Sequence, residues 1–254
     1  MKAVVRGALL PLALVLAWEG LARAGVLPPD TASRPTDVLR ALAGGLADGT
    51  ILIATGQSLA AGAAGLAIAV IAGVLLGTAL GLAPRAERIV GPTLEALRPV
   101  PAVALIPLSL LLFGFGLRME AAVIAFAAFW PVLVVTAAAV RGIEPRLLEV
   151  ARLLELSPVA RLRRIVLPAA FARILVGVRL AAGIALVVAV TVEIVLNPRG
   201  IGYSMMSAQQ SLHPDRMYAE LLWLGAVGWA LNALIGRAAA GAPGAAAAAA
   251  GAMR

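Results

Sequence analysis

Residues 51–84 run for 34 positions without a single charged side chain. A helix needs about 20 mostly apolar residues to cross the hydrocarbon core of a bilayer. Of all residues, 62% are hydrophobic and only 13% are charged. A soluble domain with this composition would have too few charged residues to cover its apolar surface. We therefore expect an integral membrane protein of the all-α class.

Further apolar stretches predict a polytopic helical bundle with six spans. The first stretch, 7–18, belongs to an N-terminal helix over 1–26, although a basic start and a short apolar centre also fit a cleavable signal peptide. The others follow the uncharged run, at 89–113, 119–140, 174–196 and 217–236.

Between and beyond these spans the composition changes. Residues 27–50 are expected to form an extracytoplasmic loop that contains one amphipathic stretch, with Val38, Leu39, Leu42 and Leu46 on one helical face. Residues 51–240 form the predicted core. Residues 241–254 are an alanine-rich tail of low complexity with no evident role.

Two spans carry patterns that constrain packing. In 51–84 small residues recur every fourth position, which lines one face so that another helix can approach closely: Gly65, Ala69, Gly73, Gly77 and Gly81. The span 89–113 is predicted to be broken by its prolines, which remove backbone hydrogen bonds: Pro92, Pro99, Pro101 and Pro107. Broken helices persist at membrane depth only when they are buried in protein or line a wet cavity.

The basic residues predict the orientation. Of the 21 Lys and Arg residues, thirteen fall on the side of both termini and six on the other, while Arg98 and Arg179 lie within spans. Cytoplasmic loops carry the excess of positive charge, so both termini are expected in the cytoplasm. The net charge of +8 is thereby explained by topology, and no nucleic-acid partner is expected.

Missing residue types exclude several chemistries. The chain has no cysteine, its single histidine is His213, and its single lysine is Lys2. Thiolate metal sites, histidine-based metal sites and a Ser-His-Asp triad are therefore not expected. A phosphate-binding P-loop needs a lysine after its glycines, so any ATP that drives this protein must be hydrolysed by another polypeptide. We expect no catalytic residue, no metal and no cofactor.

The segment 141–173 is too polar to span, with seven arginines and three glutamates. It predicts two short helices: one over 145–156 with Leu147, Ala151 and Leu154 on one face, and a second that ends near Pro168. Ser157 and Pro158 suit the N-cap and first turn of the second helix. Charge alone equally fits a solvated loop, but regular helical order favours a rigid hairpin over 144–168 that docks a partner.

This segment resembles the cytoplasmic loop of the permeases of binding-protein-dependent ABC importers, with the pattern E-A-A-x3-G-x9-I-x-L-P. Glu149, Ala151, Ile165, Leu167 and Pro168 match the pattern, Val150 replaces its second alanine, and Glu155 stands where the family has glycine. Because that glycine marks the bend, Ser157–Pro158 is an alternative position for the break.

Other motifs are similar to the nitrate, sulfonate and taurine permeases of this family. They occur in the same order as in that subgroup: RPVP at 98–101, ALIPL at 104–108, FGFG at 113–116, FWP at 129–131, VE at 192–193 and RGIGY at 199–203. The resemblance extends from about residue 17 to 240.

The resemblance implies a type I importer permease in a bacterial cytoplasmic membrane. Two copies, as a homodimer, would form the pathway, two ABC ATPase subunits would dock on the cytoplasmic loops and use the ATP, and an extracytoplasmic binding protein would deliver a nitrate-, sulfonate- or taurine-like solute. The expected ATPase-docking residues are Arg146, Glu149, Ala151, Glu155, Leu156, Ser157, Ile165 and Pro168.

Polar and proline residues within spans are candidates for a pathway or gate, because ionisable groups in a bilayer are costly and usually face a cavity or a partner. The candidates are Arg98, Pro101, Pro107, Thr191, Glu193 and Asn197. For the arginines, a position at the interface with the charge reaching water is the alternative.

Two other functions remain open from the residues alone. An ion-coupled carrier that works without an ATPase would need coupling charges near the bilayer centre, and the few charges here lie near span ends. A membrane enzyme such as an intramembrane protease would need paired catalytic groups within spans, which this sequence does not offer.

Overall fold

The computed structural model describes residues 2–28 and 31–240, and within these ranges all regular structure is helical. The predicted tail 241–254 lies outside the described residues. The chain divides into two compact units. The first unit comprises residues 1–58 and 193–227, and the second comprises 59–192 and 228–254.

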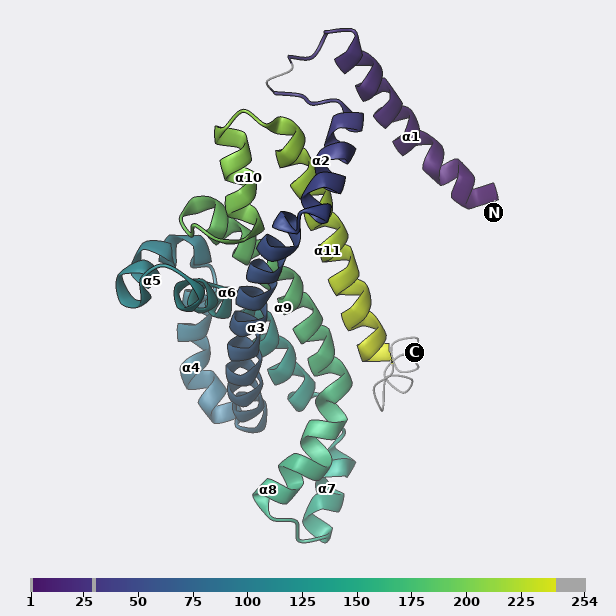
Figure 1. Cartoon of the computed structure of the whole chain (residues 1–254). Helices are drawn as coiled ribbons and strands as arrows, with labels where there is room; N and C mark the ends of the chain where they lie inside the picture. The colour runs from purple at the N-terminus through teal and green to yellow at the C-terminus, as the bar shows by residue number, and fades with distance from the viewer. Residues whose placement is uncertain (1, 29–30, 241–254) are drawn as a thin grey trace. The chain divides into compact units, whose positions relative to one another are not determined.

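The helices are labelled in Figure 1. Their bounds in chain order are α1 Lys2–Arg23, α2 Pro35–Ala47, α3 Thr50–Leu82, α4 Pro84–Leu97, the 3₁₀ helix η1 Ala102–Leu105, α5 Ile106–Phe113, α6 Leu117–Arg141, α7 Pro145–Leu153, α8 Pro158–Arg161, the π-helix η2 Leu162–Val166, α9 Leu167–Val195, α10 Gly200–Gln210 and α11 Pro214–Ala240.

Four helical stretches of the described residues are long and apolar enough to cross a membrane, namely Thr50–Leu82, Leu117–Arg141, Pro158–Val195 and Pro214–Arg237. A fifth crossing is possible through α4 followed by η1 and α5, which are bent by 84° at their junction. The predicted break of this segment is therefore observed, at Arg98–Pro101. The count of six spans is not confirmed, because α1 is not among these stretches.

The small-residue face of α3 packs directly on α6. A Cβ atom added to Gly65 would lie 2.5 Å from Cβ of Ile124, one on Gly73 would lie 2.8 Å from Cβ of Val132, and one on Gly81 would lie 2.7 Å from Cβ of Val140. At these distances no side chain fits, so the glycines let the two backbones approach, as the spacing predicts.

The register of this contact also gives the direction of the helices. Contacts advance by eight residues on both sides, from Gly65–Ile124 to Gly73–Val132 to Gly81–Val140, so α3 and α6 are parallel. The chain between them must return from the end of α3 to the end at which α3 started. The bent segment of α4, η1 and α5 makes that return, which supports its role as one crossing.

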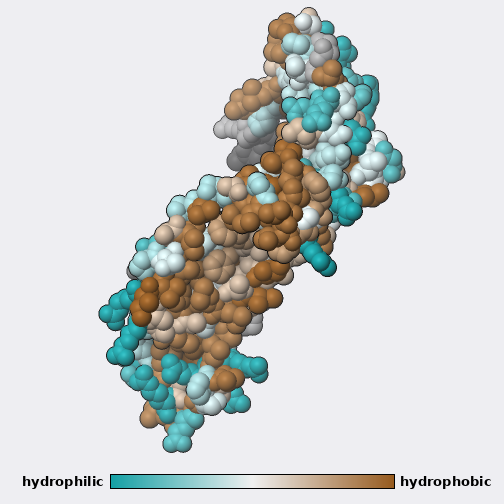
Figure 2. Space-filling model, turned by 90° about the vertical axis from the view of Figure 1, so that its left-hand side faces the viewer, coloured by the Kyte–Doolittle hydropathy of each residue, from teal (hydrophilic) through white to brown (hydrophobic). Residues whose placement is uncertain are grey.

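Helix α9 runs antiparallel to α6. A Cβ atom on Gly177 would approach Val135, and one on Gly142, near the end of α6, would approach Arg173 near the start of α9. A buried apolar cluster joins the three helices, with Ala61 and Ala69 from α3, Ala128 and Val132 from α6, and Ala181, Ala185 and Ala189 from α9. Small side chains again permit close packing. On the face drawn in Figure 2, hydrophobic residues cover the middle of this unit, and hydrophilic ones cover its lower end, where α7 and α8 lie.

In the first unit, the predicted amphipathic stretch forms α2, and Val38 is its buried apolar residue at 1% exposure. The Glu19 carboxylate of α1 accepts hydrogen bonds from the backbone and hydroxyl of Thr36 in α2. Trp18 and Tyr218 stack edge to face at 5.7 Å, and the Tyr218 hydroxyl donates to the carbonyl of Thr31. These contacts hold α1, α2 and the start of α11 together.

Candidate functional site

A helical hairpin, α7 with α8, joins α6 to α9 at the end of the second unit (Figure 1). Its base is fixed by a second apolar cluster in which Ala139, Val140 and Ile143 meet Val166, Ala170 and Ile174. Leu148 and Leu162, one from each arm, pack against the same cluster. Because apolar packing ties the hairpin to both spanning helices, a force on the hairpin is transmitted to α6 and α9.

The first arm buries a different face from the one that the sequence suggests. Ala151 is buried at 1% exposure and Leu148 is half-buried, whereas Leu147 and Leu154 are exposed. The expectation of an inward face formed by Leu147, Ala151 and Leu154 is therefore wrong for two of its three members. The inward face of this arm is instead formed by Ala151 and Leu148.

The turn between the arms lies at Glu155, where the permease pattern that this segment resembles has glycine. The Glu155 backbone is left-handed, with φ of 49°, a conformation that glycine adopts without steric cost. The backbone N–H of Leu156 donates to the carbonyl of Ala151, and that of Glu155 donates to the carbonyl of Arg152. These two bonds form a Schellman motif, so the bend keeps the geometry that glycine favours although the residue is glutamate.

The second arm begins as predicted but does not end as predicted. The Ser157 hydroxyl oxygen accepts a hydrogen bond from the N–H of Ala160 at 3.3 Å, and Pro158 occupies the first turn. The expected end near Pro168 is wrong, because one helical run extends from Pro158 to Val195. The π-helix Leu162–Val166 lies immediately before Pro168, where the missing N–H of proline would interrupt regular α-helical bonding.

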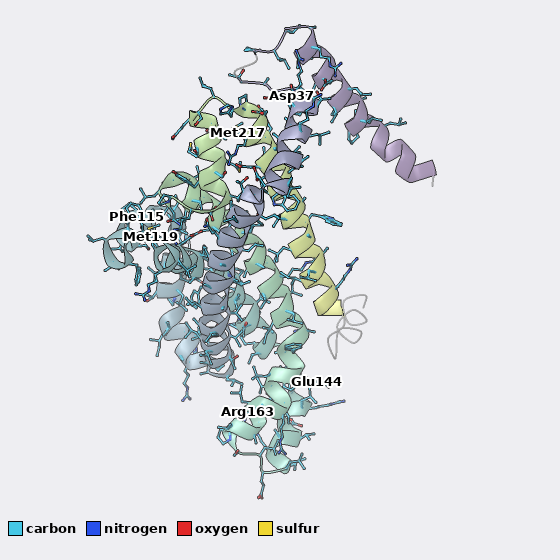
Figure 3. The ribbon with its side chains drawn as sticks, viewed as in Figure 1. Asp37, Phe115, Met119, Glu144, Arg163 and Met217 are labelled. Carbon is cyan, nitrogen blue, oxygen red and sulfur yellow. The ribbon has the colours of Figure 1, made fainter. Side chains whose placement is uncertain are left out.

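The predicted docking residues thus occupy distinct places on the hairpin. Arg146, Glu149, Glu155 and Ser157 are exposed, and Pro168 is exposed beside the π-helix. Leu156 and Ile165 are half-buried. Ala151 is buried, so it is not available to a partner in this structure. Figure 3 shows Glu144 and Arg163 on the same projecting segment.

Two apolar residues of the hairpin were missed by the sequence analysis. Leu153 is 83% exposed and Leu154 is 64% exposed, both next to the turn. Large exposed apolar side chains among charged ones are typical of a surface that a partner covers. In the sequence analysis, Leu154 is placed on the inward face and Leu153 is not named, although two adjacent leucines directly before the bend are a signal for such a surface.

The predicted pathway residues divide between the two units. In the second unit, Arg98 caps the end of α4, Pro101 precedes η1, and Pro107 lies in the first turn of α5; all three are exposed. Thr191 is half-buried and its hydroxyl donates to the carbonyl of Val187, which is a bond within its own helix.

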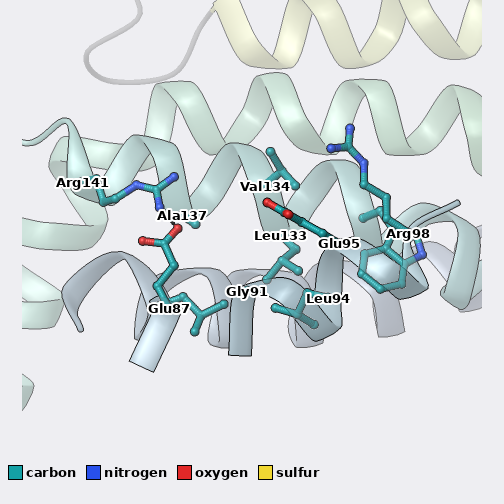
Figure 4. Close-up of a pocket in the computed structure, with 11 residues that line it drawn as sticks. Glu87, Gly91, Leu94, Glu95, Arg98, Leu133, Val134, Ala137 and Arg141 are labelled. Atoms are coloured by element: carbon teal, nitrogen blue, oxygen red, sulfur yellow. Dashed lines mark ion pairs between the residues drawn. The ribbon is translucent and has the colours of Figure 1, made fainter. Parts of the chain in front are cut away.

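Arg98 borders a cleft between α4 and α6 (Figure 4). The cleft has a volume of about 180 Å³, and the ion pair between Arg141 and Glu87 closes one end of it. No residue of α4 is buried in the structure, and the helix carries charged side chains. This face of α4 is therefore suited to water or to a second protein and poorly suited to lipid.

In the first unit, Glu193 and Asn197 are almost fully buried, each 1% exposed. Glu193 accepts a hydrogen bond from the N–H of Gly202 at 2.8 Å, at the start of α10. The N–H groups of Gly200 and Ile201 donate to the side chains of Gln57 and Ser58, both at 2.9 Å. Three side chains thus satisfy the first N–H groups of α10, and the carboxylate also stabilises the positive end of the helix dipole. The pathway role of Glu193 stays a prediction.

Among residues 2–28 and 31–240, no group of three or more histidine, aspartate or glutamate side chains is arranged to hold a metal ion. The candidate functional features of the described residues are the hairpin, the cleft beside α4 and the buried polar contacts at α10.

The described chain is thus a helical membrane domain that carries a hairpin between two spans. Comparison with known proteins gives the family: residues 43–243 match the binding-protein-dependent transport system inner membrane component. The chain belongs to this family and is a permease component of an ABC importer.

Its relatives are named for several solutes. The chain is 31% identical over 224 residues to the putative aliphatic sulfonates transport permease protein SsuC of Bacillus subtilis (strain 168), over 88% of this chain and 81% of the relative. It is 30% identical to the taurine transport system permease protein TauC of Escherichia coli (strain K12), over 86% and 82%. It is 32% identical to the nitrate import permease protein NrtB of Leptolyngbya laminosa, over 68% and 62%.

Proposed function

We propose that this chain forms the membrane passage through which an ATP-driven importer moves a small sulfonate-, nitrate- or taurine-like solute. Two copies would enclose the passage, two ATPase subunits would bind the hairpins from the cytoplasm, and an extracytoplasmic binding protein would deliver the solute. Both termini would lie in the cytoplasm of a bacterial cell with the chain in its inner membrane. ATP hydrolysis belongs to the partner, because this sequence has no P-loop lysine.

The observation that carries this proposal is the construction of the hairpin. Both of its arms are capped at the turn, by the Schellman bonds around Glu155 and by the hydroxyl of Ser157. Its base packs on α6 and α9, and its second arm continues into α9 without a break. A separate motor that displaces such a lever would move two membrane helices together. An ion-coupled carrier without an ATPase has no need of a lever on this side.

The exposed end of the hairpin supplies the contact surface. Leu153 and Leu154 offer apolar contact, and Arg146 and Glu149 add exposed charges of opposite sign to the same arm. An apolar centre with a polar rim is the usual arrangement of a protein–protein interface. The cleft with Arg98 and the polar contacts of Glu193 would then lie along the passage.

The experiment is a charge reversal in the hairpin. Glu149→Arg should weaken co-purification with the co-expressed ATPase by about tenfold or more, because it places a like charge or an unpaired charge in the interface. ATP turnover of the membrane complex should fall in parallel. Asp37→Arg makes the same change of charge on α2 and should leave both readouts unchanged. Undiminished co-purification of the Glu149→Arg variant would contradict the docking role.

A further inference from the structure

The cleft between α4 and α6 has the size and lining of a site for a small polar molecule. Its volume of about 180 Å³ exceeds the roughly 150 Å³ of an engineered cavity that holds benzene. Its walls combine apolar and charged side chains, which are Leu80, Leu94, Trp130, Leu133, Val134, Ala137, Glu87, Glu95, Arg98 and Arg141, with Gly91 between them.

The four charged groups of the cleft are not equivalent. Glu87 and Arg141 form an ion pair, so they neutralise each other. Glu95 and Arg98 are exposed, and neither makes an ion pair or a side-chain hydrogen bond within the described residues. Figure 4 shows the Glu95 carboxylate between the Glu87–Arg141 pair and Arg98. One negative and one positive group therefore remain available side by side.

Glu95 and Arg98 are three residues apart in the sequence. Residues three apart on a helix are neighbours and can form an ion pair. Here the two side chains stay separate at the end of α4, with the indole of Trp130 in the opposite wall of the cleft. The arrangement offers a guanidinium for an anionic group, a carboxylate for a cationic group, and an apolar surface for the atoms between them.

This pattern of charge favours one class of solute. The cleft has no net formal charge, since two acidic groups balance two basic ones. A simple anion could bind Arg98, but it would leave the Glu95 carboxylate facing another negative group without compensation. A molecule with its own ammonium group satisfies both side chains. Charge complementarity thus selects a short zwitterion over an anion of the same size.

We propose that the cleft is a subsite for a short zwitterionic solute, with its acidic group on Arg98, its ammonium group on Glu95 and its hydrocarbon linker against Trp130. The proposal rests on the proposed function, because it assigns the substrate class of the same passage. It goes beyond that function by predicting that the permease itself discriminates among sulfonates, in addition to any selection by a binding protein.

The test compares two probes that differ in one group. Taurine carries a sulfonate and an ammonium group, and isethionate carries the same sulfonate with a hydroxyl group in place of the ammonium. Binding of each probe to the full chain in nanodiscs is measured by titration calorimetry. We expect taurine to bind about tenfold more tightly than isethionate, the effect of one charge-assisted hydrogen bond.

Two variants assign that difference to residues. Glu95→Gln should bring taurine to the affinity of isethionate, and Arg98→Gln should abolish binding of both. Their matched controls are Glu144→Gln and Arg118→Gln, which remove exposed charges elsewhere in the second unit and should change neither affinity. Equal binding of the two probes, absence of taurine binding, or an unchanged preference in Glu95→Gln would overturn the proposal.

The same variants separate this proposal from the function on which it rests. Glu95→Gln should still co-purify with the ATPase, because the substitution lies away from the hairpin. Normal ATPase association together with no preference for taurine would refute the subsite alone. Failure of the unmodified chain to associate with the ATPase would instead refute the proposed function.

Discussion

Two regions of the second unit make opposite use of glycine. Along α3, Gly65, Gly73, Gly77 and Gly81 lie where α6 leaves no space for a side chain, and they need no unusual backbone conformation. At the turn of the hairpin, the conformation favours glycine with φ of 49°, yet the residue is Glu155, which is exposed. Where space for a side chain is lacking, a residue larger than glycine is not accommodated. An unfavourable backbone dihedral angle costs about 1–2 kcal/mol and is tolerated.

The start of α10 in the first unit combines both demands. Gly200 has φ of 87°, and a Cβ atom there would clash with the Glu193 carboxylate. This position is therefore expected to be less tolerant than either of the other two.

Gly200→Ala should give the largest loss of stability. The left-handed backbone and the clash with Glu193 together should lower the free energy of unfolding by about 3 kcal/mol. Thermal unfolding of the purified chain in detergent measures the change. Gly225→Ala, where nothing lies within 4 Å, is the control and should be neutral or slightly stabilising. A Gly200→Ala protein as stable as this control would break the comparison.

Gly77→Ala should come next. Its Cβ atom would lie 2.8 Å from the Leu133 carbonyl oxygen, so α3 and α6 must separate, at a cost of about 1–3 kcal/mol. Gly62→Ala lies on the same helix with nothing within 4 Å and should not be destabilising. If both substitutions had the same effect on thermal unfolding, close packing would not be the reason for the glycines.

Glu155→Gly should have a smaller effect in the opposite direction. Removal of the side chain relieves the left-handed backbone and should stabilise the turn by about 1 kcal/mol. Hydrogen exchange at the amide of Leu156, which bonds to Ala151, reports the change. Leu212→Gly, at the equivalent turn after α10 with φ of 56°, should slow exchange at His213 in the same way. Faster exchange at Leu156 in Glu155→Gly would show that the glutamate contributes something that the backbone argument omits.

Ser157→Ala should produce the smallest change. The cap bond is long, at 3.3 Å, and exposed, so its loss should cost about 0.5 kcal/mol. The expected result is faster hydrogen exchange at Ala160, while exchange in α3 and α6 is unchanged. Ser211→Ala serves as the control, because Ser211 follows α10 and lies outside the hairpin. Spread of the effect beyond the hairpin would mean that the turn and the spans unfold together.

Local chemistry explains which features could be predicted from the sequence. The spacing of small residues predicts the close face of α3, the prolines predict the break between α4 and η1, and Ser157–Pro158 predicts the start of the second arm. Each of these signals consists of residues that lie close to one another in the sequence. The family follows from the order of the motifs, and the match over residues 43–243 confirms it.

The features that escaped prediction depend on distant parts of the chain. Leu148 faces inward because the apolar cluster from α6 and α9 lies on that side, and a nine-residue helix has too few turns to show this by pattern. Glu193 reaches the start of α10 beside Gln57 and Ser58, which are far away in the sequence. The continuation through Pro168 depends on the π-helix before it, for which the sequence has no reliable signal.

The most direct test of the account places a single cysteine at the tip of the hairpin. The chain has no cysteine of its own, so Leu153→Cys introduces a unique thiol on a side chain that is 83% exposed. Leu111→Cys, at the same exposure on α5, is the matched control. We predict that thiol-reactive crosslinkers join position 153, but not position 111, to the ATPase. We also predict that a membrane-impermeant maleimide labels position 153 only from the cytoplasmic side. Labelling of position 153 from outside, or no crosslink to the ATPase in an actively transporting complex, would contradict the account.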